Sequence, residues 1–210
     1  NGLATLKTVV IGNNVVSIGA NAFAGTSITE LNIPDSVTTL DANAFKGMVL
    51  ETITFGAGIT EIPASMFAGM TTVKNVNIGA NTTVIGANAF ANTSIATIVI
   101  PNGVTTIAAN AFANTLLTEI KIPSTVTTID ATAFSGCALV TVDIDGNNLV
   151  VPANMFKDVI TLTSVTFGNG VVEIGASAFS GTSLTTVTIP NSITKIGTKA
   201  FENCTKLVTV

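Results

Sequence analysis

Apolar side chains recur along this chain with a period far longer than that of a single strand or helix. The clearest marker is a phenylalanine that returns every 22 or 23 residues, at Phe23, Phe45, Phe67, Phe90, Phe112, Phe134, Phe156, Phe179 and Phe201. A fixed period of this length is typical of a solenoid, in which each repeat buries its apolar face only by stacking on its neighbours. We number the repeats 1 to 9 by these phenylalanines.

The first part of each repeat predicts a short strand. In Val187-Thr188-Ile189, apolar residues alternate with a polar one, which is the period of a strand with one buried face. A proline or glycine then ends the strand, as at Pro34, Pro101, Pro123 and Pro190 or at Gly12, Gly56, Gly79 and Gly168. We expect these strands to form one parallel sheet through Val9, Leu31, Ile53, Val76, Ile98, Ile120, Val142, Val165, Val187 and Val210.

The second part of each repeat has apolar residues three positions apart, such as Val126 and Ile129. This spacing indicates extended chain or a brief second strand. The Ala-x-Ala-Phe segment that follows, at residues 20–23 in repeat 1, is too short for a regular helix and suits one helical or 3₁₀ turn. We therefore predict an α/β repeat solenoid, rich in β-structure, of about nine coils, with the phenylalanine rings in one internal column.

A longer period lies on top of the basic one. The sequence Pro-Ala-x-Met-Phe occurs at residues 63–67 and again at 152–156, which is 89 positions later, and in both repeats one extra residue follows the phenylalanine. This match predicts a duplicated block of four repeats. The extra residue should form a local bulge at residues 70–72 and again at residues 160–161.

The repeat resembles the BspA-like leucine-rich repeat, whose motif is matched almost position by position by residues 28–48 and 184–204. The resemblance implies a right-handed leucine-rich solenoid. It also implies a surface or secreted protein linked to adhesion, as many members from bacteria and protists are, with partners bound on the concave face of the strands. The chain departs from the motif at Asp145, Thr82 and Asn148, where the local turn geometry should differ.

The continuous repeat predicts one elongated domain over residues 1–210 without a linker. The chain begins and ends inside the repeat pattern, at Asn1 and Val210, although solenoids need polar caps on their terminal coils. We expect a fragment of a longer array. A chain whose ends stack into a filament and a complete protein with atypical caps are the other two interpretations.

Composition argues against several classes of function. Eight lysines against twelve acidic residues give a net charge of −4, and there is no Trp or Tyr to stack on bases, so nucleic acid is not an expected partner. Mean hydropathy is +0.65, but no run of 18 apolar residues exists, so membrane insertion is not expected either. The absence of His removes the commonest general base and metal ligand, and we expect no enzyme activity and no cofactor.

Three smaller features remain at this stage. Asp143 and Asp145 form either an exposed turn or a weak calcium contact. Cys137 and Cys204 lie three repeats apart, about 14 Å at strand spacing, which is too far for a disulfide, so both should be small buried apolar residues. Asn81, Asn92 and Asn203 begin glycosylation sequons, which arise by chance in a chain this rich in Asn and Thr.

The remaining candidate site is the outward face of the first strands. We predict that a neighbouring-cell, host or other extracellular protein binds there by weak contacts repeated along the array. A structural stalk or an end-to-end filament subunit is the alternative, and ice binding by Thr-x-Thr ladders is disfavoured by the charges at repeat 6. The candidate residues are Glu30, Asn32, Thr52, Thr54, Asn75, Asn77, Glu119, Lys121, Thr141, Asp143, Thr186 and Thr188.

Overall fold

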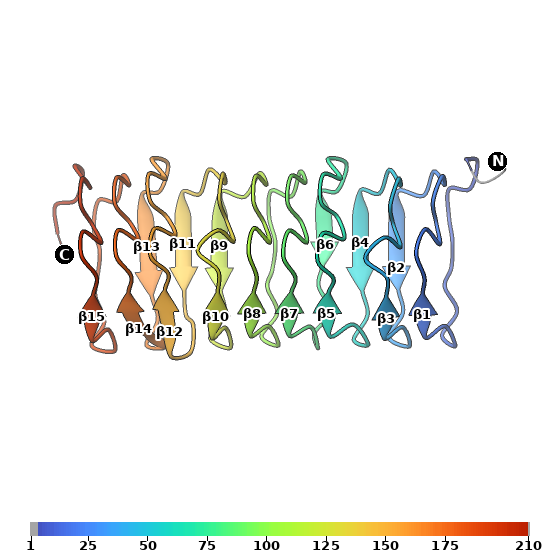
Figure 1. Ribbon diagram of the computed structural model, residues 1–210, viewed down its shortest axis with the longest axis horizontal. Helices are drawn as coiled ribbons and strands as arrows, with labels where there is room; N and C mark the ends of the chain where they lie inside the picture. Colours follow the sequence, from blue (N-terminus) through green and yellow to red (C-terminus); the bar gives the residue numbers. More distant parts are fainter. Residues whose placement is uncertain (1–3, 210) are drawn as a thin grey trace.

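The computed structural model describes residues 4–209 and shows a parallel-stranded β-solenoid of about eight turns. Figure 1 shows the repeats side by side along the long axis, with the chain ends at opposite ends of the row. The first strands of the repeats and the second strands that follow them run in opposite directions on two faces of the solenoid. The right-handed winding and the concave shape of the first-strand face stay predictions.

The first strands form two separate three-stranded parallel sheets. One contains β2 (Glu30–Ile33), β4 (Thr52–Phe55) and β6 (Asn75–Asn77), and the other contains β9 (Glu119–Ile122), β11 (Thr141–Ile144) and β13 (Ser164–Phe167). Equivalent residues lie opposite each other in every pair, as Leu31 does to Ile53. The spacing of the repeats in the sequence therefore sets the register of the paired strands.

The second strands form three further parallel sheets. The first pairs β1 (Ser17–Ile18) with β3 (Thr39–Leu40), and the second contains β5 (Glu61–Ile62), β7 (Val84–Ile85), β8 (Thr106–Ile107) and β10 (Thr128–Ile129). The third contains β12 (Leu149–Val151), β14 (Val171–Ile174) and β15 (Lys195–Ile196). Sheets on the two faces therefore end at different repeats.

The prediction of one continuous first-strand sheet is wrong. Within residues 4–209, the segments through Val9 and Ile98 belong to no strand, and that through Val187 makes only a bridge between Thr186 and Thr209. Val210 lies outside the described residues. The sheet is thus interrupted at repeats 1, 5 and 9.

Prolines coincide with the junctions where the first strands fail to pair. At two of the four paired junctions among residues 4–209, the N–H of the residue after the strand donates to the preceding repeat: Asp145 donates to the Ile122 carbonyl (2.9 Å) and Gly168 to the Ile144 carbonyl (2.8 Å). Proline has no N–H and cannot make this bond. Each of the four first-strand junctions without strand pairing has a proline here, namely Pro34, Pro101, Pro123 and Pro190.

The other two prolines break the second-strand sheets in the same way. After β7, the N–H of Gly86 donates to the Ile62 carbonyl (2.9 Å). Pro63 and Pro152 occupy the equivalent position, and in the described structure β3 is not paired with β5, nor β10 with β12. All six prolines of the chain thus mark breaks, and a junction that is open on one face is paired on the other.

The expected helical turns at the phenylalanines are also wrong, because no helix or 3₁₀ segment is present among residues 4–209. The residue two positions after each repeat phenylalanine has a positive φ, for example 75° at Gly25 and 59° at Asn92. The residue two positions before it usually does too, as at Asn88 with φ of 55°. Left-handed residues on both sides prevent a right-handed helix from forming, and the fold is all-β rather than α/β.

The phenylalanine rings are stacked inside the solenoid, but in two columns rather than one. Six rings stack from Phe23 to Phe134 and three from Phe156 to Phe201, with centroids 5.3 to 6.3 Å apart. The break between the columns coincides with Pro152. In repeat 6, just before this break, the Asp130 carboxylate accepts the Thr132 N–H (2.8 Å). In several other repeats the equivalent N–H donates to the following repeat instead.

The four-repeat block is supported by matching local structure. The N–H of Thr71 donates to the Gly69 carbonyl and that of Ile160 to the Asp158 carbonyl, both at 2.9 Å, where the bulges were predicted. A third bond of this kind, from Thr205 to Asn203, follows Phe201 at 2.9 Å. The prolines obey the same 89-residue period, since Pro34, Pro63 and Pro101 recur as Pro123, Pro152 and Pro190.

The residues that depart from the repeat motif change the structure only in their own surroundings. Asn148 has φ of 51°, and Leu149 takes the buried place beside a register shift in the β12–β14 pair. Thr82 is fully buried and its hydroxyl donates to the Ile59 carbonyl (2.9 Å). Both cysteines are free, and burial raises the pKa of the Cys137 thiol.

Candidate functional site

The first-strand face consists of the outward side chains of the first strands, as strand alternation predicts. Glu30, Asn32, Asn75 and Asn77 are exposed, whereas the inward Leu31 between the first two is buried. Of the other predicted site residues, Thr52, Thr54 and Asp143 are half-buried and the rest are exposed, namely Glu119, Lys121, Thr141, Thr186 and Thr188. All twelve are therefore accessible from solvent.

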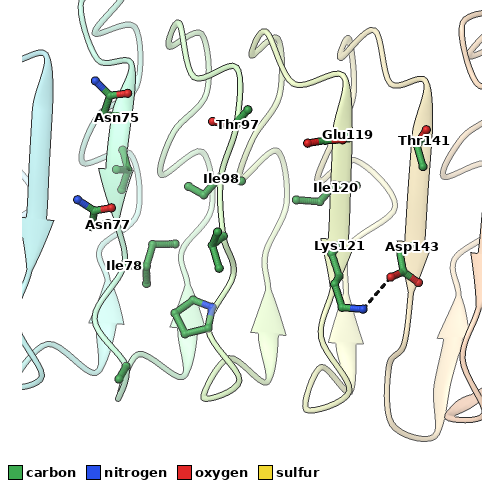
Figure 2. Close-up of a pocket in the computed structure, with 14 residues that line it drawn as sticks. Asn75, Asn77, Ile78, Thr97, Ile98, Glu119, Ile120, Lys121, Thr141 and Asp143 are labelled. Carbon is green, nitrogen blue, oxygen red and sulfur yellow. Dashed lines mark hydrogen bonds and ion pairs between the residues drawn. The ribbon is translucent and has the colours of Figure 1, made fainter.

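A hollow on this face lies where the sheet is interrupted. It has a volume of about 700 Å³ and spans the first strands of repeats 4 to 7. Figure 2 shows the unpaired first strand of repeat 5, with Thr97 and Ile98, between the strand that carries Asn75 and the strand that carries Glu119. We call this hollow the repeat-5 groove.

The floor of the groove is aliphatic. Ile98 and Ile78 are half-buried, whereas Ile53 and Ile122, which occupy the same two positions in paired repeats, are 0% and 1% exposed. The missing strand pairing thus opens the core edge to solvent. Val99, which points outward from repeat 5, is 81% exposed.

One rim of the groove carries a compact charge cluster. The Lys121 ammonium lies 2.7 Å from Asp143 Oδ2 and 3.1 Å from Asp145 Oδ2. Hydrogen bonds to Asp143 and then to Asp145 raise the pKa of Lys121. Burial alone would raise the pKa of Asp143, but hydrogen bonds from Lys121 and Thr166 and the lysine charge outweigh burial and lower it. The Lys121 ammonium thus occupies the position beside Asp143 and Asp145 that a calcium ion would need.

The other groups on the rim are less engaged. Within residues 4–209, the Glu119 carboxylate has no hydrogen-bond or ion-pair partner. On the opposite rim, the Asn75 amide donates to the Thr52 hydroxyl (3.2 Å) and the Asn77 amide to the Thr54 hydroxyl (3.0 Å). On the rim that carries Lys121, the three carboxylates of Asp143, Asp145 and Glu119 outnumber the single ammonium group. That rim therefore carries a net negative charge.

The groove unites half of the predicted site and adds residues that sequence reasoning missed. It brings together Asn75, Asn77, Glu119, Lys121, Thr141 and Asp143. Glu30, Asn32, Thr52 and Thr54 lie on β2 and β4, and Thr186 and Thr188 lie on repeat 9, outside the groove. The missed lining residues include Ile78, Ile98, Val99 and Pro101, and the outward apolar Val99 beside Pro101 was the available signal.

Two kinds of functional element are absent from the described part of the chain. Residues 4–209 contain no group of three or more His, Cys, Asp or Glu side chains arranged to hold a metal. They also contain no helix long and apolar enough to cross a membrane. The lining of the groove consists of neutral polar groups, aliphatic side chains, carboxylates and the Lys121 ammonium.

The family model for the BspA type leucine-rich repeat region matches residues 2–115 and 83–208, with six copies. Together these matches span nearly the whole chain. The chain belongs to the BspA-type leucine-rich repeat family. No sequence match to a curated protein was found.

Solved structures similar to this BspA-type protein include three bacterial leucine-rich repeat proteins. One from Bacteroides ovatus is 23% identical, with a TM-score of 0.65 over 96% of this chain and 65% of its own. A leucine-rich cell surface protein from Faecalibacterium prausnitzii is 21% identical, with a TM-score of 0.51 over 93% and 82%. A T. pallidum leucine-rich repeat protein is 17% identical, with a TM-score of 0.55 over 94% and 79%. This chain thus spans slightly less than two thirds of the Bacteroides protein, and these likenesses support the fold.

Proposed function

We propose that this BspA-type array is a non-enzymatic protein-binding module that engages an extracellular partner through its first-strand face. The observation that carries the proposal is the repeat-5 groove, an interruption of the polar first-strand face above a half-buried aliphatic floor. Placement on a rigid sheet lowers the ordering cost of association. Protein–protein interfaces typically have a core depleted of charged residues and a polar, solvent-accessible rim.

Presentation at a cell surface is part of the proposal. The similar F. prausnitzii protein is described as a cell surface protein. Neutral Thr and Asn contacts each contribute little, and Trp, Tyr and Arg, the residues enriched in hot spots, are missing from the chain. Weak contacts repeated along an array suit adhesion, since multivalent attachment strengthens them without any single high-affinity epitope.

A stalk or an end-to-end filament subunit is the second candidate. The staggered sheets favour it, because each junction between repeats 2 and 8 is paired on at least one face. A single cluster of buried hydrophobic side chains also extends from Ile18 to Ala200, and this continuous core stiffens the rod. In this role the first-strand face would be ordinary solvated surface.

A charge-matched pair of variants separates the two candidates. We expect a triple lysine variant of the first-strand face to bind immobilised extracellular-matrix proteins or whole cells at least about tenfold more weakly than the unmodified chain, because repulsion and desolvation act at the interface. The same charge change on the second strands should leave binding within about twofold. The two variants are Glu30→Lys/Thr141→Lys/Thr188→Lys and Thr39→Lys/Glu61→Lys/Thr128→Lys, all at exposed positions. Equal binding by both would favour the stalk or filament.

A further inference from the structure

Repeat 5 has an unusual backbone. Within residues 4–209, the N–H and C=O groups of residues 96–100 make no backbone hydrogen bond, although repeats lie on both sides. The reason is that Pro101 cannot donate to repeat 4 and Pro123 cannot donate to repeat 5. A strand unpaired on both sides inside a solenoid retains peptide groups that a second chain could satisfy.

Solvent reaches this strand through the repeat-5 groove. Thr97, Ile98 and Val99 all line the groove. The carbonyls of Ile78 and Ile100 also accept no backbone hydrogen bond, because the residues opposite them are the two prolines. The groove therefore combines unused main-chain groups with the half-buried side chains of Ile78 and Ile98.

We propose that the repeat-5 groove binds an extended peptide segment of a partner protein, with an aliphatic side chain against Ile98 and Val99 and a lysine or arginine beside Glu119. This inference rests on the proposed function and specifies the chemistry of the partner. Extended peptides are recognised by main-chain hydrogen bonds that give affinity and by side-chain contacts that give specificity.

The charges of the groove select a basic partner. Lys121 is engaged by Asp143 and Asp145, so its ammonium is compensated within the chain. Glu119 lies two residues before Lys121 on β9, opposite Thr141 of β11, without such compensation. A cationic side chain gains an ion pair there, whereas an acidic segment meets net negative charge, which is how charge complementarity discriminates between partners.

The proline positions recur with the four-repeat block. Pro101 and Pro190 are 89 residues apart, as are Pro34 and Pro123 and the outward residues Val10 and Val99. The first-strand sheet is interrupted at repeats 1, 5 and 9 in keeping with this period.

The decisive variant closes the groove by restoring the missing donors. Glycine occupies the proline position at paired junctions, as at Gly168, so Pro101→Gly/Pro123→Gly should let the strand of repeat 5 pair with both neighbours. The probe is an acetylated, amidated heptapeptide alternating valine with lysine, titrated by calorimetry. We expect the double variant to bind it at least about tenfold more weakly, while the matched Pro34→Gly/Pro190→Gly variant stays within about twofold of the unmodified chain.

Two further measurements separate the parts of the proposal. Glu119→Gln should weaken heptapeptide binding about three- to fivefold at low salt, which corresponds to one exposed ion pair. Thr39→Lys, the same charge change at an exposed position on the second strand β3, should leave it within about twofold. A heptapeptide methylated on alternate backbone nitrogens should bind at least about tenfold more weakly, because it loses main-chain donors.

The outcomes distinguish this inference from the proposed function. Equal affinity for the methylated and unmodified peptides, or no loss in Pro101→Gly/Pro123→Gly, overturns peptide capture by the groove. If the heptapeptide does not bind but the triple lysine variant of the first-strand face still loses its partner, only the inference fails. If neither the peptide nor the partner depends on this face, the proposed function fails as well.

Discussion

Replacing Phe112 with alanine should lower the free energy of unfolding by about 3 to 5 kcal/mol, the range for a fully buried phenylalanine. Phe112 is 0% exposed, and its ring stacks at 5.4 Å on both Phe90 and Phe134. Truncation therefore leaves a cavity between two repeats. Those repeats are held by hydrogen bonds on the second-strand face and cannot collapse into it, so the full transfer and cavity costs should appear.

Phe201→Ala is the matched control. Phe201 is half-buried and stacks on Phe179 at 5.5 Å. Less apolar surface is lost there, so the expected cost is smaller. Equilibrium unfolding in guanidinium chloride measures both losses, and the comparison holds if the denaturant dependence is the same in the two variants. Equal losses would show that the rings do not stabilise the array by stacking between repeats.

Gly86→Ala should lower the free energy of unfolding by about 1 to 3 kcal/mol, as overpacking against fixed atoms does. A Cβ at Gly86 would lie 2.7 Å from both the Ala64 nitrogen and the Ile62 carbonyl oxygen. These are backbone atoms of the preceding repeat. The Gly86 N–H holds the same carbonyl at 2.9 Å, so neither repeat can move away without losing that bond.

Gly19→Ala, at the equivalent position of repeat 1, tests whether the cost comes from contact between repeats. A Cβ there meets no atom within 4 Å. Alanine reduces the freedom of the unfolded chain, so the variant should be unchanged or more stable by up to about 1 kcal/mol. Thermal and denaturant melts of the two variants give the comparison. A similar loss in both would mean that backbone conformation, not close packing, sets the requirement for glycine.

The sequence predicted the features that depend on one repeat at a time. Alternation in Val187-Thr188-Ile189 indicates which side chains face the core, and the spacing of the phenylalanines indicates that equivalent residues lie opposite each other. The four-repeat block could also be predicted, because Pro63 and Pro152 stand in identical surroundings. These signals are local and repeat with the period of the fold.

The failures came from effects that reach between repeats or depend on backbone conformation. The prolines were interpreted as strand ends within their own repeat, although Pro101 also removes a donor that repeat 4 would have used. The helical turn was expected from Ala-x-Ala-Phe, but Asn88 adopts φ of 55° before Phe90 and redirects the chain. The groove followed from the first of these errors, since an assumed continuous sheet leaves no opening.

The central claim is that the prolines interrupt the first-strand sheet and leave the backbone of repeat 5 unpaired. Hydrogen–deuterium exchange of backbone amides tests it most directly, because exchange follows the local protection of each N–H. Amides of residues 97–100 should exchange much faster than those of β4 and β11, which have paired strands on both sides. In Pro101→Gly/Pro123→Gly the same amides should become protected. Slow exchange at residues 97–100 in the unmodified chain would contradict the account.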